Sequence, residues 1–183
     1  MASFARLNSL IASPAAGFEQ PFEMMEACHE RLQRTLGLLE RLRAHVARHG
    51  ADEQAQQAAR DVMRYFDKAA PQHHLDEELH VFPPLVARGD PSMLVLVARL
   101  QQDHLQMDAR WRMVHAILEQ LERAEIQAIP PAGEAEIDAF ARLYGDHIDA
   151  EEQLAYPAAA ALLDDGARDA MGAEMRRRRG AGS

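Results

Sequence analysis

The chain has 183 residues, 48% of them hydrophobic and 27% charged, which fits one globular domain and excludes a disordered chain. Its net charge of -9 argues against a nucleic-acid partner, because phosphate binding requires a basic surface. The sequence contains no run of about 18 apolar residues, so we expect a soluble protein without a membrane partner.

The cysteine content and the first residues bear on the cellular compartment. The single cysteine, Cys28, cannot form an intramolecular disulfide, so nothing indicates an oxidising compartment. In the opening stretch MASFARLNSLIASPAAG, Asn8 and Ser9 interrupt the apolar core that a signal peptide requires. We therefore expect a cytoplasmic location.

Two helices are predicted in the first half of the chain. After a lead segment, residues 1–20, Pro21 is suited to open a helix that ends near Gly50. A second helix is expected from about Asp52 to about Pro83, with a kink at Pro71. Both stretches carry apolar side chains at intervals of three and four residues, which indicates one buried face on each helix.

The second half repeats this plan. A third helix is predicted to follow residues 89–91 and to end by residues 130–131, and a fourth begins near Glu134 with Leu154 on its apolar face. Strand signals are nearly absent. These elements predict an all-α fold, an up-down-up-down four-helix bundle over residues 21–163. Residues 164–183 are expected to form a short C-terminal helix or tail, whose basic run, Arg176 to Arg179, we interpret as solvated.

Chemically active side chains continue the apolar stripes of all four predicted helices. Each helix directs one histidine inward, and two of the helices also direct a glutamate inward. An unpaired carboxylate or imidazole is costly to bury, so these groups require a partner. A histidine and a glutamate four residues apart share one helix face, and their nitrogen and oxygen atoms suit iron, manganese or zinc. The candidate metal ligands are His29, His73, Glu77, His104, His147 and Glu151.

The spacing of these residues indicates an internal repeat. Antiparallel packing places His29 and His73 at the same level, because each lies about 20 residues from the first turn. Several pairs are separated by 74 residues, namely His73 and His147, Glu77 and Glu151, and Phe82 and Tyr156. His29 and His104 are separated by 75. Two copies of a helix pair, related by a pseudo-two-fold axis, would present two carboxylates between two metal ions.

The sequence resembles the hemerythrin-like, or HHE cation-binding, family over roughly residues 20 to 160. The resemblance rests on His29, on HHLDEELHVFP, on Asp103-His104 and on HIDAEEQLAYP. It implies a non-haem di-iron centre in which the four histidines are terminal ligands and Glu77 and Glu151 bridge two iron ions. It also implies oxygen, nitric oxide or peroxide as a small ligand at an open coordination position. Zinc and manganese accept the same ligands and stay open.

One position departs from the family's oxygen carriers, which place a second histidine four residues after the ligand on the third helix. Here that position is Asp108. This resembles the subgroup with a more open centre, which includes di-iron proteins linked to nitric oxide and iron-sulfur repair, although nothing here resembles their cysteine-bearing N-terminal segment. Two alternatives therefore stay open: a di-iron enzyme for peroxide removal or for repair, and a binding module that responds to iron or oxygen. A bundle without a metal is the remaining possibility.

Four further residues are candidates for the surroundings of the centre. The pair His74 and Glu78 forms a competing register of the second helix. We prefer His73 and Glu77, because Glu78 aligns with Glu152 in the second copy whereas His74 aligns with Ile148. Tyr144 and Glu26 lie one turn before ligand histidines and can hydrogen-bond a ligand. Asp108 can ligate weakly or through water.

Overall fold

The computed structural model describes residues 17–180, and within this range the chain consists of helices and connecting turns without a strand. The all-α prediction is therefore confirmed for the described residues. Residues 1–16, which include Asn8 and Ser9, and residues 181–183 lie outside this range. The elements are α1 (Pro21–His49), α2 (Glu53–Asp76), the π-helix η2 (Glu77–Val81), α3 (Phe82–Arg88), α4 (Pro91–Glu122), α5 (Pro131–Ala150), the π-helix η3 (Glu151–Ala155), α6 (Tyr156–Leu162) and α7 (Asp165–Arg178).

Local sequence signals set where these helices begin and end. Asp52 caps α2, where its side chain accepts a hydrogen bond of 2.9 Å from the Ala55 N–H. Asp90 and Asp164 cap α4 and α7 in the same way. The turn after α3 contains Gly89 at φ 75°, a left-handed conformation that glycine adopts without strain.

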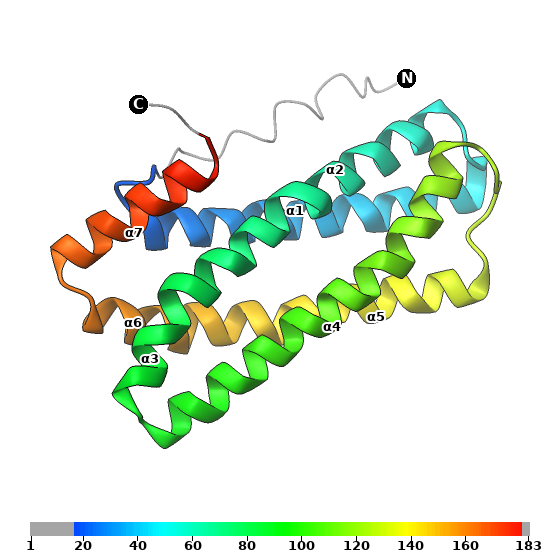
Figure 1. Ribbon diagram of the computed structural model, residues 1–183. Helices are drawn as coiled ribbons and strands as arrows, with labels where there is room; N and C mark the ends of the chain where they lie inside the picture. The colour runs from blue at the N-terminus through cyan, green and yellow to red at the C-terminus, as the bar shows by residue number, and fades with distance from the viewer. Residues whose placement is uncertain (1–16, 181–183) are drawn as a thin grey trace.

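The long helices α1, α2, α4 and α5 lie alongside one another, and the chain reverses direction between consecutive ones (Figure 1). Buried side chains of these helices and of α3 and α6 form two hydrophobic clusters, one containing Leu39, Phe66, Leu118 and Phe140, and the other containing Met25, Phe82, Leu100 and Tyr156. Along each long helix the inward histidine falls between members of the two clusters. The six candidate ligands therefore form a polar layer with apolar packing on both sides.

Two π-turns alter the predicted inner faces. The prediction that the second helix ends at Pro83 is wrong, because α3 continues to Arg88, and the prediction that Leu154 faces inward is wrong, because its side chain is 50% exposed. The N–H of Tyr156 bonds to the carbonyl of Glu151, five residues earlier, so the inner face passes from Glu151 to Tyr156.

The prolines after each π-turn explain why the turn forms. Pro83 and Pro157 have no N–H to donate to the carbonyl four residues earlier, so the regular α-helical hydrogen bond is missing at that point. The Phe82 N–H bonds to Glu77 and the Tyr156 N–H to Glu151, the same step in both halves. The repeat separation of 74 residues therefore relates two equal distortions of the backbone.

The C-terminal helix α7 packs against the end of the molecule where α1 begins (Figure 1). The interpretation of its basic run as solvated is wrong for two residues, because Arg178 and Arg179 form ion pairs with Asp76, which is 0% exposed. Arg178 Nη2 lies 2.7 Å from Asp76 Oδ1. A buried carboxylate needs charged partners, and here two guanidinium groups from the chain itself supply them.

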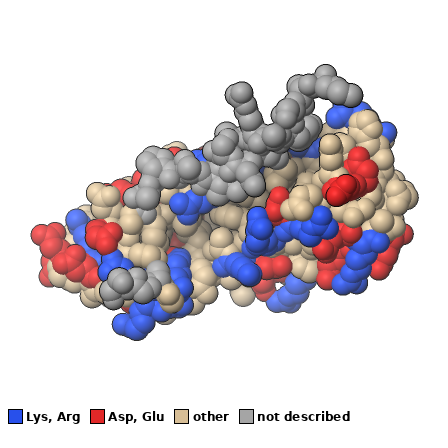
Figure 2. Space-filling model, turned by 90° about the horizontal axis from the view of Figure 1, so that it is seen from above, with Lys and Arg blue, Asp and Glu red and all other residues tan. Residues whose placement is uncertain are grey.

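One face of the molecule is mixed in charge. On the face seen from above, lysine and arginine side chains are interspersed with aspartate and glutamate side chains (Figure 2). None of the helices in the described part of the chain has an apolar stretch long enough to span a membrane.

Candidate metal centre

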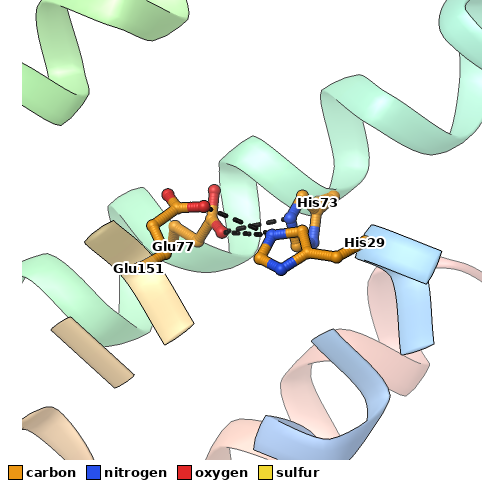
Figure 3. A group of neighbouring side chains, drawn as sticks. All are labelled: His29, His73, Glu77 and Glu151. Atoms are coloured by element: carbon orange, nitrogen blue, oxygen red, sulfur yellow. Dashed lines mark ion pairs between the residues drawn. The ribbon is translucent and has the colours of Figure 1, made fainter. Parts of the chain in front are cut away.

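The structure brings the six candidate ligands together, as their spacing predicts. They form two groups of four that share both glutamates: His29, His73, Glu77 and Glu151, and Glu77, His104, His147 and Glu151. Within each group, one donor nitrogen or oxygen atom from each residue lies within 4.8 Å of the donor atoms of the other three. All six side chains are buried, His104 being the most exposed at 7%. Figure 3 shows the first group, with residues from α1, α2, η2 and η3 directed toward one another.

Glu77 directs one carboxylate oxygen toward each pair of histidines. Its Oε1 atom lies 3.1 Å from His73 Nε2 and 3.9 Å from His29 Nε2. Its Oε2 atom lies 3.3 Å from His104 Nε2, in the second group. One carboxylate can therefore reach two metal positions.

Glu151 repeats this arrangement from the opposite side. Its Oε2 atom lies 3.2 Å from His29 Nε2, and its Oε1 atom lies 3.0 Å from His147 Nε2 and 3.8 Å from His104 Nε2. Both glutamates thus lie between the two histidine pairs, which is the arrangement that two bridging carboxylates require.

Several of these atoms are buried without a hydrogen-bond partner: Glu77 Oε2, His104 Nε2, His147 Nε2 and both carboxylate oxygens of Glu151. Leaving a buried polar group unpaired costs about 1–3 kcal/mol, and more for a charged one. Two metal ions, one held by each group of four residues, would satisfy these atoms. The residues present therefore fit a pair of cations held by imidazole and carboxylate ligands.

Comparison with known proteins identifies the family of the chain. The model of the family described as the hemerythrin HHE cation binding domain matches residues 20–159. The chain belongs to this family. An uncharacterized protein of Haemophilus influenzae is 32% identical over 139 residues, which cover 76% of this chain and 78% of that protein.

The HHE domain holds opposite charges in close contact at its centre. Burial opposes the charge on His104, but the close carboxylates of Glu151 and Glu77 outweigh this and raise the pKa of His104 to about 10. Burial and the neighbouring Glu77 oppose the charge on Glu151, yet the surrounding histidines lower the pKa of Glu151 to about 2. Without a metal, imidazolium groups thus balance the carboxylates.

Carboxylates outside this layer orient three of the four histidines. Glu152 Oε1 lies 2.9 Å from His29 Nδ1, and Glu78 Oε1 lies 3.0 Å from His104 Nδ1. Such a contact fixes the ring so that Nε2 points to the metal position. Glu78 and Glu152 are 74 residues apart, so the pseudo-two-fold relation extends to these carboxylates.

The third contact joins His147 Nδ1 to Asp103 Oδ2 at 3.4 Å. Asp103 directly precedes His104 in the chain. The corresponding histidine of the first half is His29, and the residue directly before it is Cys28. No carboxylate therefore occupies the corresponding position beside His73, and its Nδ1 atom is buried without a hydrogen-bond partner.

The other four predicted residues divide into two kinds. His74 stacks on the His104 ring with centroids 4.1 Å apart, and burial, with the adjacent His104, lowers the pKa of His74 to about 3. His74 is therefore uncharged and packs against the centre through its ring. Tyr144 is buried in the aromatic core with Phe140. The structure does not bring Glu26 or Asp108 to the centre: both are exposed, and Asp108 pairs with Arg112.

Tyr156 is a residue of the centre that the sequence reasoning did not assign. Its O–H donates a hydrogen bond to Glu77 Oε1, its Oη atom lies 3.2 Å from His29 Nε2, and its ring stacks on that of His29. Burial, together with the charge of Glu77, raises the pKa of Tyr156 well above its ordinary value. Its counterpart Phe82 packs against His104 with ring centroids 5.7 Å apart. The 74-residue separation was the available signal for this pair.

Proposed function

We propose that this chain is a di-iron protein that binds or senses oxygen, nitric oxide or peroxide. The observation that carries the proposal is the pair of buried carboxylates, Glu77 and Glu151, each with one oxygen toward either histidine pair. His29 and His73 would hold one iron, His104 and His147 the other, and both glutamates would bridge them. When bound, the irons would supply redox chemistry and an open coordination position for the small ligand.

Three features support iron and an open position. Imidazole and carboxylate donors suit iron, and the HHE family is described as cation binding. Each metal position has two imidazoles and one oxygen from each glutamate within reach, so a six-coordinate ion would not be saturated by these four donors. We propose that an up-down-up-down four-helix bundle holds this di-iron centre, and that the protein is cytoplasmic.

The chain's own residues hold and shield this position. The Nδ1 contacts of Glu152, Glu78 and Asp103 keep three Nε2 atoms directed inward. Phe82 and the neutral ring of His74 pack against His104. Packing on both sides of the polar layer excludes bulk water and strengthens the electrostatic interactions inside it.

Iron quantitation combined with absorption spectra tests this function. We expect about two iron ions per chain after anaerobic loading, and a spectrum that changes reversibly on exposure to oxygen or nitric oxide. Parallel loading with zinc and with manganese compares the affinities of the three metals. A chain that takes up no iron, or whose iron-loaded form shows no spectral change with oxygen, nitric oxide or peroxide, contradicts the proposal. Rapid peroxide turnover without a stable spectral change would favour the di-iron enzyme.

A further inference from the structure

The two halves of the centre differ at the residue that follows each π-turn. Tyr156 follows η3 and Phe82 follows η2, and the two are 74 residues apart. Both side chains are buried, at 2% and 1% exposure. The first half therefore has a phenol oxygen at the place where the second half has only a hydrocarbon ring.

The distances around this phenol match those between ligands of one metal ion. Two donor atoms bound side by side at about 2.0–2.2 Å from a metal lie roughly 3 Å apart. Tyr156 Oη is 3.2 Å from His29 Nε2, the same separation as Glu151 Oε2 has from that nitrogen. The Tyr156 hydroxyl also bonds to Glu77 Oε1, which faces His73 and His29.

Building on the proposed di-iron function, we propose that Tyr156 is a further protein ligand of the metal ion held by His29 and His73. On binding, the phenol O–H bond breaks, the metal–oxygen bond forms, and the proton leaves to water. A hard, anionic oxygen suits ferric iron, which tyrosine also ligates in some haem proteins. The bridging glutamates are shared, so this oxygen belongs to one half of the centre alone.

The consequence is that the two metal positions are unequal. The first has donors from His29, His73, Tyr156 and both glutamates, whereas the second has His104, His147 and the same glutamates, with Phe82 in the place of the tyrosine. The second position, next to Phe82 and His74, is then the one with more room for a small ligand.

Visible spectroscopy of the iron-loaded protein tests this assignment, because a phenolate bound to ferric iron gives a charge-transfer band. We expect the band in the wild-type chain loaded with iron and oxidised in air, no band with zinc, and loss of the band from Tyr156→Phe when absorbance is expressed per bound iron. A wild-type chain with about two irons and no such band overturns the inference and leaves the proposed function intact. A chain that binds no iron contradicts the proposed function itself.

Matched variants assign the band to this tyrosine. The chain has three tyrosines, so Tyr65→Phe and Tyr144→Phe are the controls, and both should retain the full band. Phe82→Tyr places a phenol in the second half and should add a second contribution. If Tyr156→Phe fails to fold, resonance Raman of the iron-loaded Tyr65→Phe/Tyr144→Phe double variant, in which Tyr156 is the sole tyrosine, decides instead. Phenolate bands that shift when the tyrosine ring is deuterated support the assignment, and the absence of such bands contradicts it.

Discussion

Asp76 and Glu77 are adjacent in the chain and both are 0% exposed, yet their charges are balanced in different ways. Asp76 lies against α7 and pairs with Arg178 and Arg179. Glu77 faces the histidines, and its Oε2 atom has no hydrogen-bond partner. A buried carboxylate needs a positive partner, and the fold supplies two arginines for Asp76 and histidines, which are candidate metal ligands themselves, for Glu77. The difference separates a structural charge from a candidate functional one.

The largest effect should follow from removing the charge of either candidate bridging carboxylate, Glu77 or Glu151. Glu77→Gln and Glu151→Gln keep the side-chain volume but lose the negative charge between the histidine pairs, so iron uptake should fall from about two ions per chain to less than half of that. Metal analysis after anaerobic loading measures this, with circular dichroism to check folding. Asp76→Asn is the matched control, and a folded Asp76→Asn chain should retain its iron. Full uptake by either glutamate variant would show that the carboxylates are not bridging ligands.

Removing the arginine partners of Asp76 should lower the stability of the fold rather than its metal content. Arg178→Ala/Arg179→Ala leaves Asp76 buried without partners, and because both arginines are partly exposed we expect a loss of about 2–4 kcal/mol in the free energy of unfolding. Urea denaturation measures it. Arg177→Ala, a change at an exposed position of the same helix, should cost less than about 0.5 kcal/mol. Equal losses in both variants would mean that Asp76 does not depend on α7.

A smaller effect is expected at the carboxylates that contact the histidines from outside. Glu78→Gln and Glu152→Gln remove the charged partners of His104 and His29, and the loss of such a partner typically costs about 10–100-fold in metal affinity. Competition with a chelator of known affinity measures the change. The partly exposed positions of Glu78 and Glu152 place the expectation at the lower end. Glu23→Gln on α1, an exposed glutamate, is the control and should leave the affinity unchanged.

The ligand layer was predictable because its determinants are local and repeated. Helical periodicity places His73 and Glu77 on one face, and the 74-residue separation repeats that face in His147 and Glu151. The structure brings these side chains together, while their binding of iron stays a prediction. The order of the four histidines along antiparallel helices then follows from the turn positions alone.

Two features escaped prediction for physical reasons. A π-turn adds one residue to the helical step, so a regular period places Leu154 inside, where the structure has Tyr156. Pro157 after the turn is the available sequence signal, because a proline removes the regular hydrogen bond there. The pairing of Asp76 with Arg178 links residues 102 positions apart, and one acid among many offers no pattern that selects its partner.

The smallest effect is expected at His74, which stands beside His73 as Asp76 stands beside Glu77. His73→Ala should abolish iron binding at the first position, because its Nε2 atom lies 3.1 Å from Glu77 Oε1 within the first group. His74→Ala removes a ring that stacks on His104 and leaves all six proposed ligands in place, so iron uptake should stay at about two ions per chain. Metal analysis of the two variants, loaded side by side, distinguishes the registers. Loss of iron from His74→Ala with retention in His73→Ala would shift the ligand assignment of this helix by one residue, and would make the stacked ring of His74, rather than His73, the imidazole that faces the metal.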